Sequence, residues 1–446
     1  MKRSFAAAVV ALLSVGVVAG GVLPVGASTA APNAVGIVTL TFVDRQRSTP
    51  AWNGQAREPE RALVTTVLYP AVGSPGSAGP VSGAAPDRST APYPLIVFAH
   101  GFGATPQDYE NLLSHWASQG YVVAAPLFPL THSGTPGGLD EGDLASQPGD
   151  MSFVITSALT ASRHSTGTLA GMIDARVVGA AGHSNGAITT LGLVANTCCH
   201  DARVGAAVVL AGQENPFTGG HVDYLHAPPL LLVHGTADDD VPYSDAEMVF
   251  NHARGPKALL TVEGGDHSSA AGFEAPSATS VLGTTTDFFD AYLKRDPTAR
   301  GRLSADQQPG ITTMHAALAA GSTVTITTTP TPKLDLHATV TPHQKLTNGQ
   351  QVTITWSGYT PGATVNLLQC SGLATQPSDE ARCGFANAVL LHPDPTGSGS
   401  LPLTIVTGKV GDGICDATHP CTIVVNNAGH TDPASSIRLP ISFAAA

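Results

Sequence analysis

The positions of hydrophobic and polar residues predict that strands and helices alternate along about the first two thirds of the chain. Residues 95–99 (LIVFA) form a continuous apolar run, as expected for a strand buried on both faces of a sheet. In residues 109–116 the apolar positions recur at helical spacing. Thr105 can cap this helix, Pro106 suits its first position, and Asp108 favours its first turn. The first predicted unit is therefore a buried strand followed by an amphipathic helix.

The same alternation continues as far as residue 302. Ser244 and Glu247 have the spacing of a capping box and predict the start of one helix. Alternation of this kind predicts a doubly wound, mainly parallel α/β sheet with helices on both faces, over residues 35–322. Further strands are expected at 121–125, 177–181, 205–210, 230–233 and 259–262, and further helices at 151–161, 187–194 and 285–293.

The pattern changes near Gly321. The Thr- and Pro-rich run over residues 323–332 (TVTITTTPTP) predicts an extended linker. After it, short strand-like runs are separated by Gly, Pro, Asn and Asp, and helical periodicity is absent from the sequence. Residues 333–446 are therefore expected to form an all-β sandwich. Its strands are expected at 334–340, 351–356, 363–368, 399–406, 422–425 and 437–443.

The N-terminus has the pattern of a secretory signal peptide over residues 1–27. Lys2 and Arg3 precede an apolar, alanine-rich stretch, and small residues at 25–27 or 28–30 suit a signal peptidase. The alternative is a retained membrane anchor. No later segment approaches the roughly 20 apolar residues that span a bilayer. We therefore expect a secreted protein with no stable membrane span after cleavage.

The amino-acid composition indicates which classes of binding partner the chain can have. The formal net charge is -12, charged residues make up 12% of the chain, and there is no basic stripe. An acidic chain of this kind is a poor candidate for binding the phosphates of nucleic acids. Hydrophobic residues make up 42%, which is enough for a sizeable core. We expect a monomer that does not bind nucleic acid.

Residues 182–186 (GHSNG) carry the candidate nucleophile, Ser184. A strand of small residues leads into this GxSxG motif and a helix leaves it. Gly182 and Gly186 permit a sharp turn that lifts the serine hydroxyl clear of the sheet. The alternative is a glycine-rich turn in which Ser184 only caps the helix.

The candidate acid and base follow Ser184 in the order serine, acid, histidine. Hydrolases with a GxSxG turn of this kind use that order. Asp238 lies just after the expected strand at 230–233, and we prefer it to Asp239 and Asp240, which fit a solvated acidic turn. His267 lies on a glycine-rich loop after the strand at 259–262. It is the expected general base, which takes the Ser184 proton while Asp238 orients its ring.

An oxyanion hole needs two backbone N–H donors. One is expected from Asn185, the residue after the nucleophile, and the other from Phe102, with Gly101 a close second. His100, His183 and His234 stand at expected strand ends, where histidines are more often structural. The sequence has no HExxH motif and no zinc-ribbon cysteine spacing, and we expect no metal and no cofactor.

Six cysteines fall into two groups. Cys198 and Cys199 are adjacent and could be buried thiols or a vicinal disulfide. The remaining four lie in the last quarter of the chain, at spacings suited to two local loops, and an exported chain permits disulfides. These four are Cys370, Cys383, Cys415 and Cys421.

The segments HGFGATPQDYENLLSHWASQGYVVAAP, GHSNG, HGTADDDVP and GGDHS together resemble the α/β-hydrolase superfamily. Within it, residues 62–70 (ALVTTVLYP) and the HGFG loop are similar to the branch of platelet-activating-factor acetylhydrolases, chlorophyllases and cutinase-like polyester hydrolases. The resemblance covers about residues 35–305. It implies hydrolysis of carboxylic esters without a cofactor. That branch often has Met or a bulky aliphatic residue where this chain has Asn185.

Residues 333–446 resemble the neocarzinostatin family of apoproteins. The similar segments are ATVTPHQKLTNGQQVTITWSGYTPGATVNLLQC, GSGSLPLTIV, ICDATHPCTIVVNNA and IRLPISF. The resemblance implies an immunoglobulin-like sandwich with disulfides Cys370–Cys383 and Cys415–Cys421, in agreement with the cysteine spacing.

The sequence as a whole predicts a secreted serine esterase that acts on a small-molecule, lipid or polymeric ester. Two other functions use the same features. A serine amidase or peptidase would use the same triad, and a binding protein would act through the C-terminal sandwich.

Overall fold

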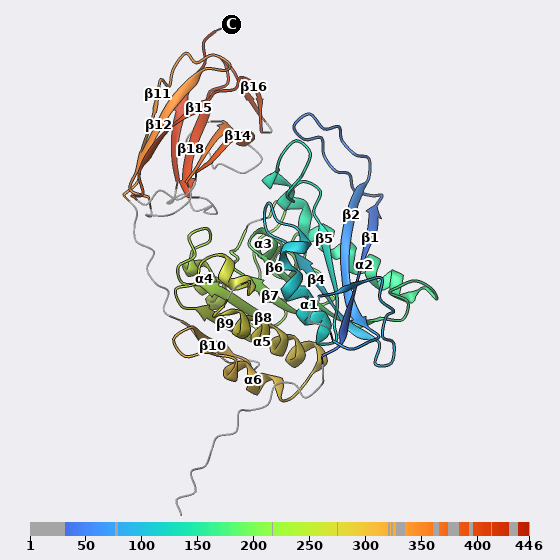
Figure 1. The fold of residues 1–446 in the computed structure, drawn as a ribbon. Helices are drawn as coiled ribbons and strands as arrows, with labels where there is room; N and C mark the ends of the chain where they lie inside the picture. Colours follow the sequence, from blue (N-terminus) through green and yellow to red (C-terminus); the bar gives the residue numbers. More distant parts are fainter. Residues whose placement is uncertain are drawn as a thin grey trace, which may run out of the picture.

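The computed structural model describes residues 32–445, apart from 76–78, 216, 274, 320–321, 323, 327–334, 360–364, 373–382, 392–395, 412 and 428–435. The signal-peptide segment 1–27 and most of the expected linker lie outside the described residues. The N-terminal part is built around one ten-stranded sheet, with strand order β10-β9-β8-β7-β6-β4-β5-β2-β1-β3 (Figure 1). The strands are β1 (Ala34–Asp44), β2 (Arg61–Ala71), β3 (Val81–Ser82), β4 (Tyr93–Ala99), β5 (Val122–Leu127), β6 (Ile173–His183), β7 (Val204–Leu210), β8 (Leu230–Gly235), β9 (Lys257–Val262) and β10 (Thr312–Ala317).

The middle of this sheet is parallel, and antiparallel strand pairs lie on both sides of it. Strand β4 pairs in parallel with β5 and β6, and the parallel register continues through β7, β8 and β9. On one side β2 runs antiparallel to β5 and β1 antiparallel to β2, and the short edge strand β3 is parallel to β1. On the other side β10 runs antiparallel to β9. Strands β7, β8 and β9 are apolar and buried along nearly their whole length because helices cover both faces. Because β4, β6, β8 and β9 run parallel, their carboxyl ends lie at the same end of the sheet. This is where α/β folds place their active sites.

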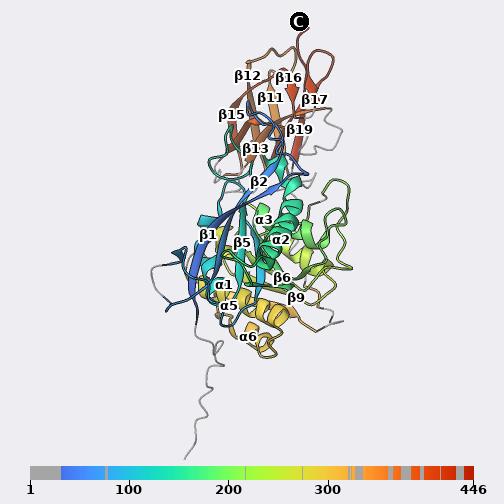
Figure 2. The same ribbon diagram turned by 90° about the vertical axis from the view of Figure 1, so that its right-hand side faces the viewer.

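The helices divide between the two faces of the sheet, as Figures 1 and 2 show. Helices α2, α3 and α4 contribute to one buried cluster, and α1, α5 and α6 to the other. These helices are α1 (Glu110–Ser118), α2 (Gln147–Arg163), α3 (Asn185–Ala195), α4 (Tyr243–His252), α5 (Ala278–Phe289) and α6 (Ala299–Ala305). Shorter helical turns are η1 (Pro106–Tyr109), η2 (Glu141–Ser146), η3 (Ser268–Ala271) and the π-turn η4 (Asp290–Lys294).

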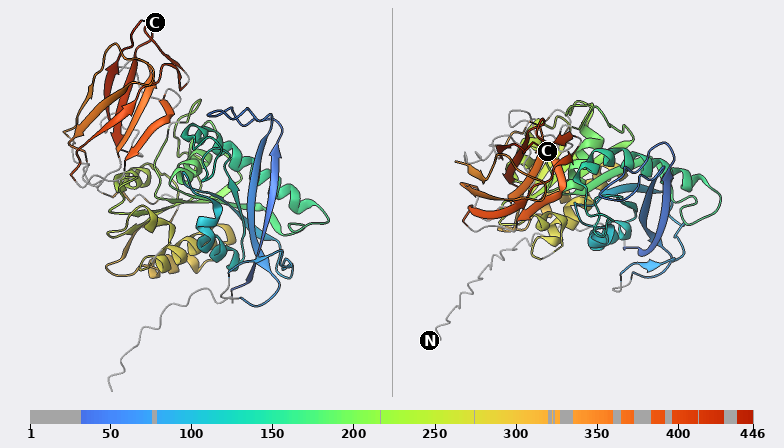
Figure 3. Two further views of the ribbon diagram at one scale, coloured as in Figure 1. Left: turned by 45° about the horizontal axis from the view of Figure 1, so that its top comes forward. Right: turned by 90° about the horizontal axis from the view of Figure 1, so that it is seen from above.

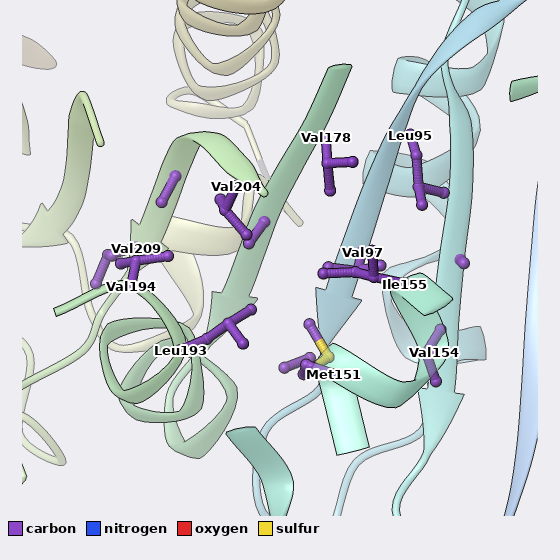
Figure 4. Close-up of a cluster of buried hydrophobic side chains, with 14 of the residues drawn as sticks. Leu95, Val97, Met151, Val154, Ile155, Val178, Leu193, Val194, Val204 and Val209 are labelled. Atoms are coloured by element: carbon purple, nitrogen blue, oxygen red, sulfur yellow. The ribbon is translucent and has the colours of Figure 1, made fainter. Parts of the chain in front are cut away.

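The core on the α2 and α3 side consists of side chains that interlock between helix and strand. In Figure 4, Met151 and Ile155 of α2 lie against Val97 of β4, and Leu193 of α3 lies near the strands that carry Val178 and Val209. Met151, Ile155 and Val97 are fully buried. Burial of a side chain of this size contributes roughly 1.5–3 kcal/mol. This core fixes α3, and with it the residue that precedes α3, Ser184.

Most of the expected elements are present, but two helices begin at other residues than expected and several elements were not predicted. The capping-box prediction was wrong, because α4 begins at Tyr243 with Pro242 as its N-cap residue, which puts Ser244 inside the helix. The helix expected from residue 285 begins earlier, at Ala278, and runs into the π-turn η4. Helix α6 and the strands β1, β2, β3, β10, β14, β16 and β17 were not predicted.

The C-terminal strands form a separate body of antiparallel sheets, which Figure 3 shows beside the N-terminal sheet. One sheet has the order β11-β12-β15, another β14-β13-β18-β19, and a hairpin joins β16 to β17. Their apolar faces enclose a cluster of their own, which includes Trp356 and Ile423. Disulfides join Cys370 to Cys383 and Cys415 to Cys421. The strands are β11 (His337–Thr341), β12 (Gln351–Ser357), β13 (Val365–Ser371), β14 (Cys383–Leu391), β15 (Gly399–Thr404), β16 (Gly408–Val410), β17 (Gly413–Cys415), β18 (Cys421–Asn427) and β19 (Ser436–Ile441).

A short segment after β10 still belongs to the N-terminal packing. Val324 and Ile326 pack against the α2–α3–α4 cluster. The Asn251 side chain on α4 donates to the Ile326 carbonyl over 3.1 Å and accepts the Ile326 N–H over 3.0 Å. In the part of the chain that the structure describes, no helix is long and apolar enough to cross a membrane.

Candidate active site

Ser184 occupies a sharp turn between strand β6 and helix α3. Its backbone has φ 58° and ψ -125°, in the left-handed region that non-glycine residues rarely adopt. The flanking glycines are required by close approach, because a Cβ at Gly182 would collide with the Gly186 backbone and one at Gly186 with the Ala99 carbonyl. The Ser184 N–H donates to the Leu210 carbonyl over 3.0 Å, which fixes the turn to β7. This geometry is that of a nucleophile elbow.

Asp238 and His267 meet at the ends of β8 and β9. The His267 Nδ1 lies 2.8 Å and 3.0 Å from the two carboxylate oxygens of Asp238. The loops that carry them are joined by backbone contacts, since the Ala237 N–H donates to the Gly265 carbonyl over 2.9 Å. Asp238 is 8% exposed, whereas its neighbour Asp239 is exposed. Among the three adjacent aspartates, Asp238 is therefore the one that faces the imidazole.

The surroundings of Asp238 hold it as a carboxylate. Its Oδ1 accepts the N–H groups of Asp240 and Val241 at 3.0 and 2.8 Å. Burial opposes the charge, but hydrogen bonds from His234 and His267 outweigh it and hold the Asp238 pKa well below its usual range. Burial likewise opposes the charged form of His267, yet the hydrogen bond and charge of Asp238 raise the His267 pKa above its ordinary value. The pair is thus arranged as an anchored carboxylate and a basic imidazole.

The His267 ring also lies next to the nucleophile elbow. Its centroid is 4.8 Å from that of His183, the residue before Ser184. Within the described residues, the hydrogen bonds of the His267 ring run only through Nδ1 to Asp238. With a proton on Nδ1, the Nε2 lone pair remains available to accept a proton from Ser184. Ser184 and His267 are not hydrogen-bonded to each other in this structure, and catalytic hydrogen bonds of this kind often tighten only in the reacting complex.

The loop after β4 passes beside Ser184. A Cβ at Gly101 would lie 3.2 Å from the Ser184 Cβ. Three N–H groups of this loop are occupied, since Gly101 donates to the Tyr109 hydroxyl, Gly103 to the Thr131 carbonyl and Ala104 to the Gly101 carbonyl. Within the described part of the chain, the Phe102 N–H has no such partner. Together with the first N–H of α3, from Asn185, it provides two unoccupied donors near the nucleophile.

The peptide group between Gly101 and Phe102 has a defined orientation. Its carbonyl oxygen accepts from His100 Nδ1 at 2.8 Å and from the Ala104 N–H at 3.1 Å. In a trans peptide the C=O and N–H bonds point in opposite directions, so the Phe102 N–H points away from these two donors. This favours Phe102 over Gly101, whose own N–H is bound to Tyr109.

The three histidines at strand ends all have backbone partners. His100 Nε2 accepts the Phe128 N–H at 3.1 Å, and burial lowers the His100 pKa to about 4. His234 Nε2 donates to the Val241 carbonyl at 2.8 Å and lies 3.2 Å from Asp238. His183 bonds to the His267 carbonyl. Through these hydrogen bonds the three rings hold the loops of the site in place.

Two aromatic residues at the site were not predicted. Tyr109 matched the apolar spacing of its helix, but its hydroxyl bonds to both Gly101 and His183. Phe273 follows the His267 loop and is 37% exposed, with its ring 5.2 Å from that of Tyr109 and 6.1 Å from that of His183. An exposed phenyl ring beside the reacting groups offers an apolar wall to a substrate. The sequence gives no periodic signal for it, because it lies in a loop.

Other candidate features lie outside this site. A cavity of about 410 Å³ between β1 and α2 is lined by Leu40, Phe42 and His164 but by no triad residue. Cys198 and Cys199 form a vicinal disulfide after α3. In the described residues, no three His, Cys, Asp or Glu side chains are grouped so that they could hold a metal ion.

Comparison with known proteins gives a match to each of the two parts of the chain. Residues 72–232 match the chlorophyllase family, over a segment that includes the elbow and ends before Asp238. Residues 338–443 match the neocarzinostatin family. No curated protein matches the chain. Among solved structures, a ferulic acid esterase from Streptomyces cinnamoneus is 24% identical, with a TM-score of 0.45, over 61% of this chain and 93% of that one.

The chain thus combines an α/β-hydrolase domain that resembles chlorophyllases with a β-sandwich that resembles neocarzinostatin apoproteins. The chlorophyllase match supports an ester hydrolase.

Proposed function

We propose that this protein is a secreted serine hydrolase that cleaves carboxylic esters through an acyl-enzyme intermediate. The observation that carries the proposal is the pairing of the Asp238 carboxylate with His267 beside the elbow that presents Ser184. The pattern of a signal peptide and three disulfides supports an oxidising, extracellular location.

In the first half of the reaction, Ser184 Oγ attacks the carbonyl carbon of the ester while His267 Nε2 takes its proton. Asp238 holds Nδ1 protonated and stabilises the imidazolium that forms. The carbonyl oxygen becomes an oxyanion, which receives the N–H groups of Phe102 and Asn185. Collapse of this intermediate breaks the bond to the alcohol oxygen, and His267 returns the proton to the leaving alcohol.

In the second half, water replaces the alcohol. His267 Nε2 takes a proton from the water as its oxygen attacks the acyl carbon, and the same two N–H groups receive the oxyanion again. Collapse of this second intermediate breaks the bond between the acyl carbon and Ser184 Oγ, and His267 Nε2 gives its proton to Oγ, which releases the carboxylic acid and restores the Ser184 hydroxyl. No cofactor is needed in either half. The exposed Phe273 ring suits an ester with an apolar acyl or alcohol group.

The test is hydrolysis of p-nitrophenyl esters of increasing acyl length by the full secreted chain. We expect turnover by the wild-type protein and its loss, by several orders of magnitude, in Ser184→Ala. Ser157→Ala, a serine on α2 outside the site, is the matched control and should retain activity. Wild-type-like turnover by a folded Ser184→Ala protein would refute the proposal.

A further inference from the structure

Besides the loop of Asp238, which follows β8, three segments that are distant in sequence supply the groups of the proposed site. The oxyanion loop follows β4, the nucleophile elbow follows β6, and the loop of the general base follows β9. The triad contacts alone do not connect the oxyanion loop to the base. We propose that Tyr109 and His183 form a directional hydrogen-bond relay that holds these three segments in register, and that both are positioning residues for catalysis.

The relay consists of three consecutive hydrogen bonds. The Gly101 N–H donates to the Tyr109 hydroxyl oxygen over 3.1 Å. The Tyr109 hydroxyl lies 2.9 Å from His183 Nδ1, and His183 Nε2 lies 2.9 Å from the His267 carbonyl oxygen. These bonds therefore run from the oxyanion loop, through the residue that precedes Ser184, to the backbone of the general base.

The chemistry of the partners fixes the direction of each bond. A carbonyl oxygen can only accept, so His183 Nε2 carries the proton that bonds to His267. A neutral imidazole has a single N–H, which leaves Nδ1 as an acceptor for the Tyr109 hydroxyl. Burial and repulsion from His267 lower the His183 pKa to about 3, so the ring stays neutral. Burial also raises the Tyr109 pKa, which keeps its proton in place.

The relay is enclosed by the protein. Tyr109 is 2% exposed and His183 is 5% exposed. The Tyr109 ring packs 4.8 Å from Phe98, a fully buried residue of β4. Because water does not compete with buried hydrogen bonds, their loss leaves both the Gly101 N–H and His183 Nδ1 without partners.

Two catalytic groups depend on the ends of the relay. At one end, the bond to Tyr109 fixes the Gly101 N–H, and His100 fixes the Gly101 carbonyl. The Phe102 N–H lies in the same peptide plane as that carbonyl, so the direction of this N–H bond is fixed as well. At the other end, the His267 carbonyl is held against the residue that precedes Ser184. A displacement of about 1 Å at either end would misalign the reacting atoms.

The first experiment removes the Tyr109 hydroxyl from the full chain by Tyr109→Phe. The readout of this experiment rests on the proposed esterase function. We expect kcat to fall on the order of 10- to 100-fold with KM little changed, because substrate contacts remain while alignment is lost. The matched control is Tyr121→Phe, which removes a buried hydroxyl bonded to Asp290 at 2.6 Å, outside the site. That control should lose stability but keep kcat. Equal kcat in wild-type and Tyr109→Phe proteins would overturn the relay.

The second experiment does not depend on esterase activity. Histidine-selective ¹⁵N NMR on the wild-type protein reports the tautomer of each ring, and His183→Gln identifies the His183 signals. We expect His183 to carry its proton on Nε2, unchanged between about pH 5 and pH 8. A proton on Nδ1, or a charged His183 in that range, would overturn the relay. If the wild-type protein hydrolyses no ester, the proposed function fails while this measurement still decides the relay.

Discussion

Asp238 is the residue that orients the proposed general base, His267. Four groups donate to its carboxylate: the N–H groups of Asp240 and Val241, and the rings of His234 and His267. Asp239 differs in that its side chain is exposed and outside this set of bonds. The two positions therefore provide a matched comparison for the same chemical change.

We predict that Asp238→Asn lowers kcat by about 10⁴-fold, because an amide cannot hold His267 in the tautomer with the proton on Nδ1. Asp239→Asn should leave kcat within a small factor of wild type. Steady-state kinetics on a p-nitrophenyl ester, with circular dichroism to verify folding, measures both. If Asp239→Asn were the damaging change, the acid would be assigned to the wrong residue.

The sequence located the candidate triad because position adds to residue type. Ser184, Asp238 and His267 each follow a buried strand, and the carboxyl ends of parallel strands share an edge. Tyr109 could not be found in this way. Its apolar spacing marks it as a core residue, and its hydroxyl finds Gly101 and His183 only once the loops have folded.

At the scale of secondary-structure elements, the predicted starts of two helices, α4 and α5, were wrong. Ser244 and Glu247 have capping-box spacing, but the helix begins at Tyr243 and Glu247 is 4% exposed, so its side chain faces the interior. Helix α5 begins seven residues before its expected start at residue 285, in a Ser/Thr-rich stretch with weak helix propensity. Its buried face packs Val281 and Phe288 against the sheet, and this tertiary packing outweighs propensity.

At the contact between α5 and α6, the carboxyl groups of Asp287 and Asp306 lie close enough to affect each other's pKa. Burial raises the pKa of Asp306 to about 7, and the charge of Asp287 and a hydrogen bond with it add to this effect. An acid whose pKa is raised on folding binds more protons in the folded than in the unfolded state. Its stability contribution is therefore present below the unfolded pKa and is lost as pH rises through about 4 to about 7.

We predict that the Asp287–Asp306 pair lowers the melting temperature of the hydrolase domain as pH rises over this range, opposite to the effect of the buried neutral His100 and His183, and that Asp306→Asn removes this lowering. After allowance for solvent screening, the difference should be about 1 kcal/mol, or roughly 2–4 °C. Scanning calorimetry at a series of pH values measures it. Asp174→Asn is the control, since the Asp174 pKa is lowered by its hydrogen bonds with Arg176. An unchanged pH slope in Asp306→Asn would show that the pair does not titrate as described.

At the scale of the whole molecule, the change of sequence pattern near Gly321 marks the division of the chain into two parts. The C-terminal strands have their own buried cluster and two disulfides with sequence separations of 13 and 6. Bridges of this kind contribute about 2–4 kcal/mol, less for short loops. The contacts of Val324 and Ile326 with the hydrolase core are not visible in the sequence pattern, because they depend on Asn251 of α4.

We predict that a chain ending at Pro330 keeps its turnover of soluble esters. It retains every proposed catalytic residue and the Asn251–Ile326 hydrogen bonds. Rates on a soluble p-nitrophenyl ester and on an insoluble polyester or lipid emulsion should be compared for the truncated and full chains. Selective loss on the insoluble substrate would indicate that the sandwich holds the enzyme near a surface. Equal rates on both would indicate a spacer, and collapse of soluble turnover would contradict the independence of the two domains.

The central claim is that Ser184 is a nucleophile activated by His267, and covalent labelling tests it most directly. A fluorophosphonate probe reacts with a serine only when that serine is activated, so the labelled peptide identifies the nucleophile. We predict a single adduct on the peptide that contains Ser184, lost in Ser184→Ala, greatly slowed in His267→Ala and unaffected in Ser157→Ala. Label on a different serine, or no label on a folded protein that hydrolyses esters, would contradict the account.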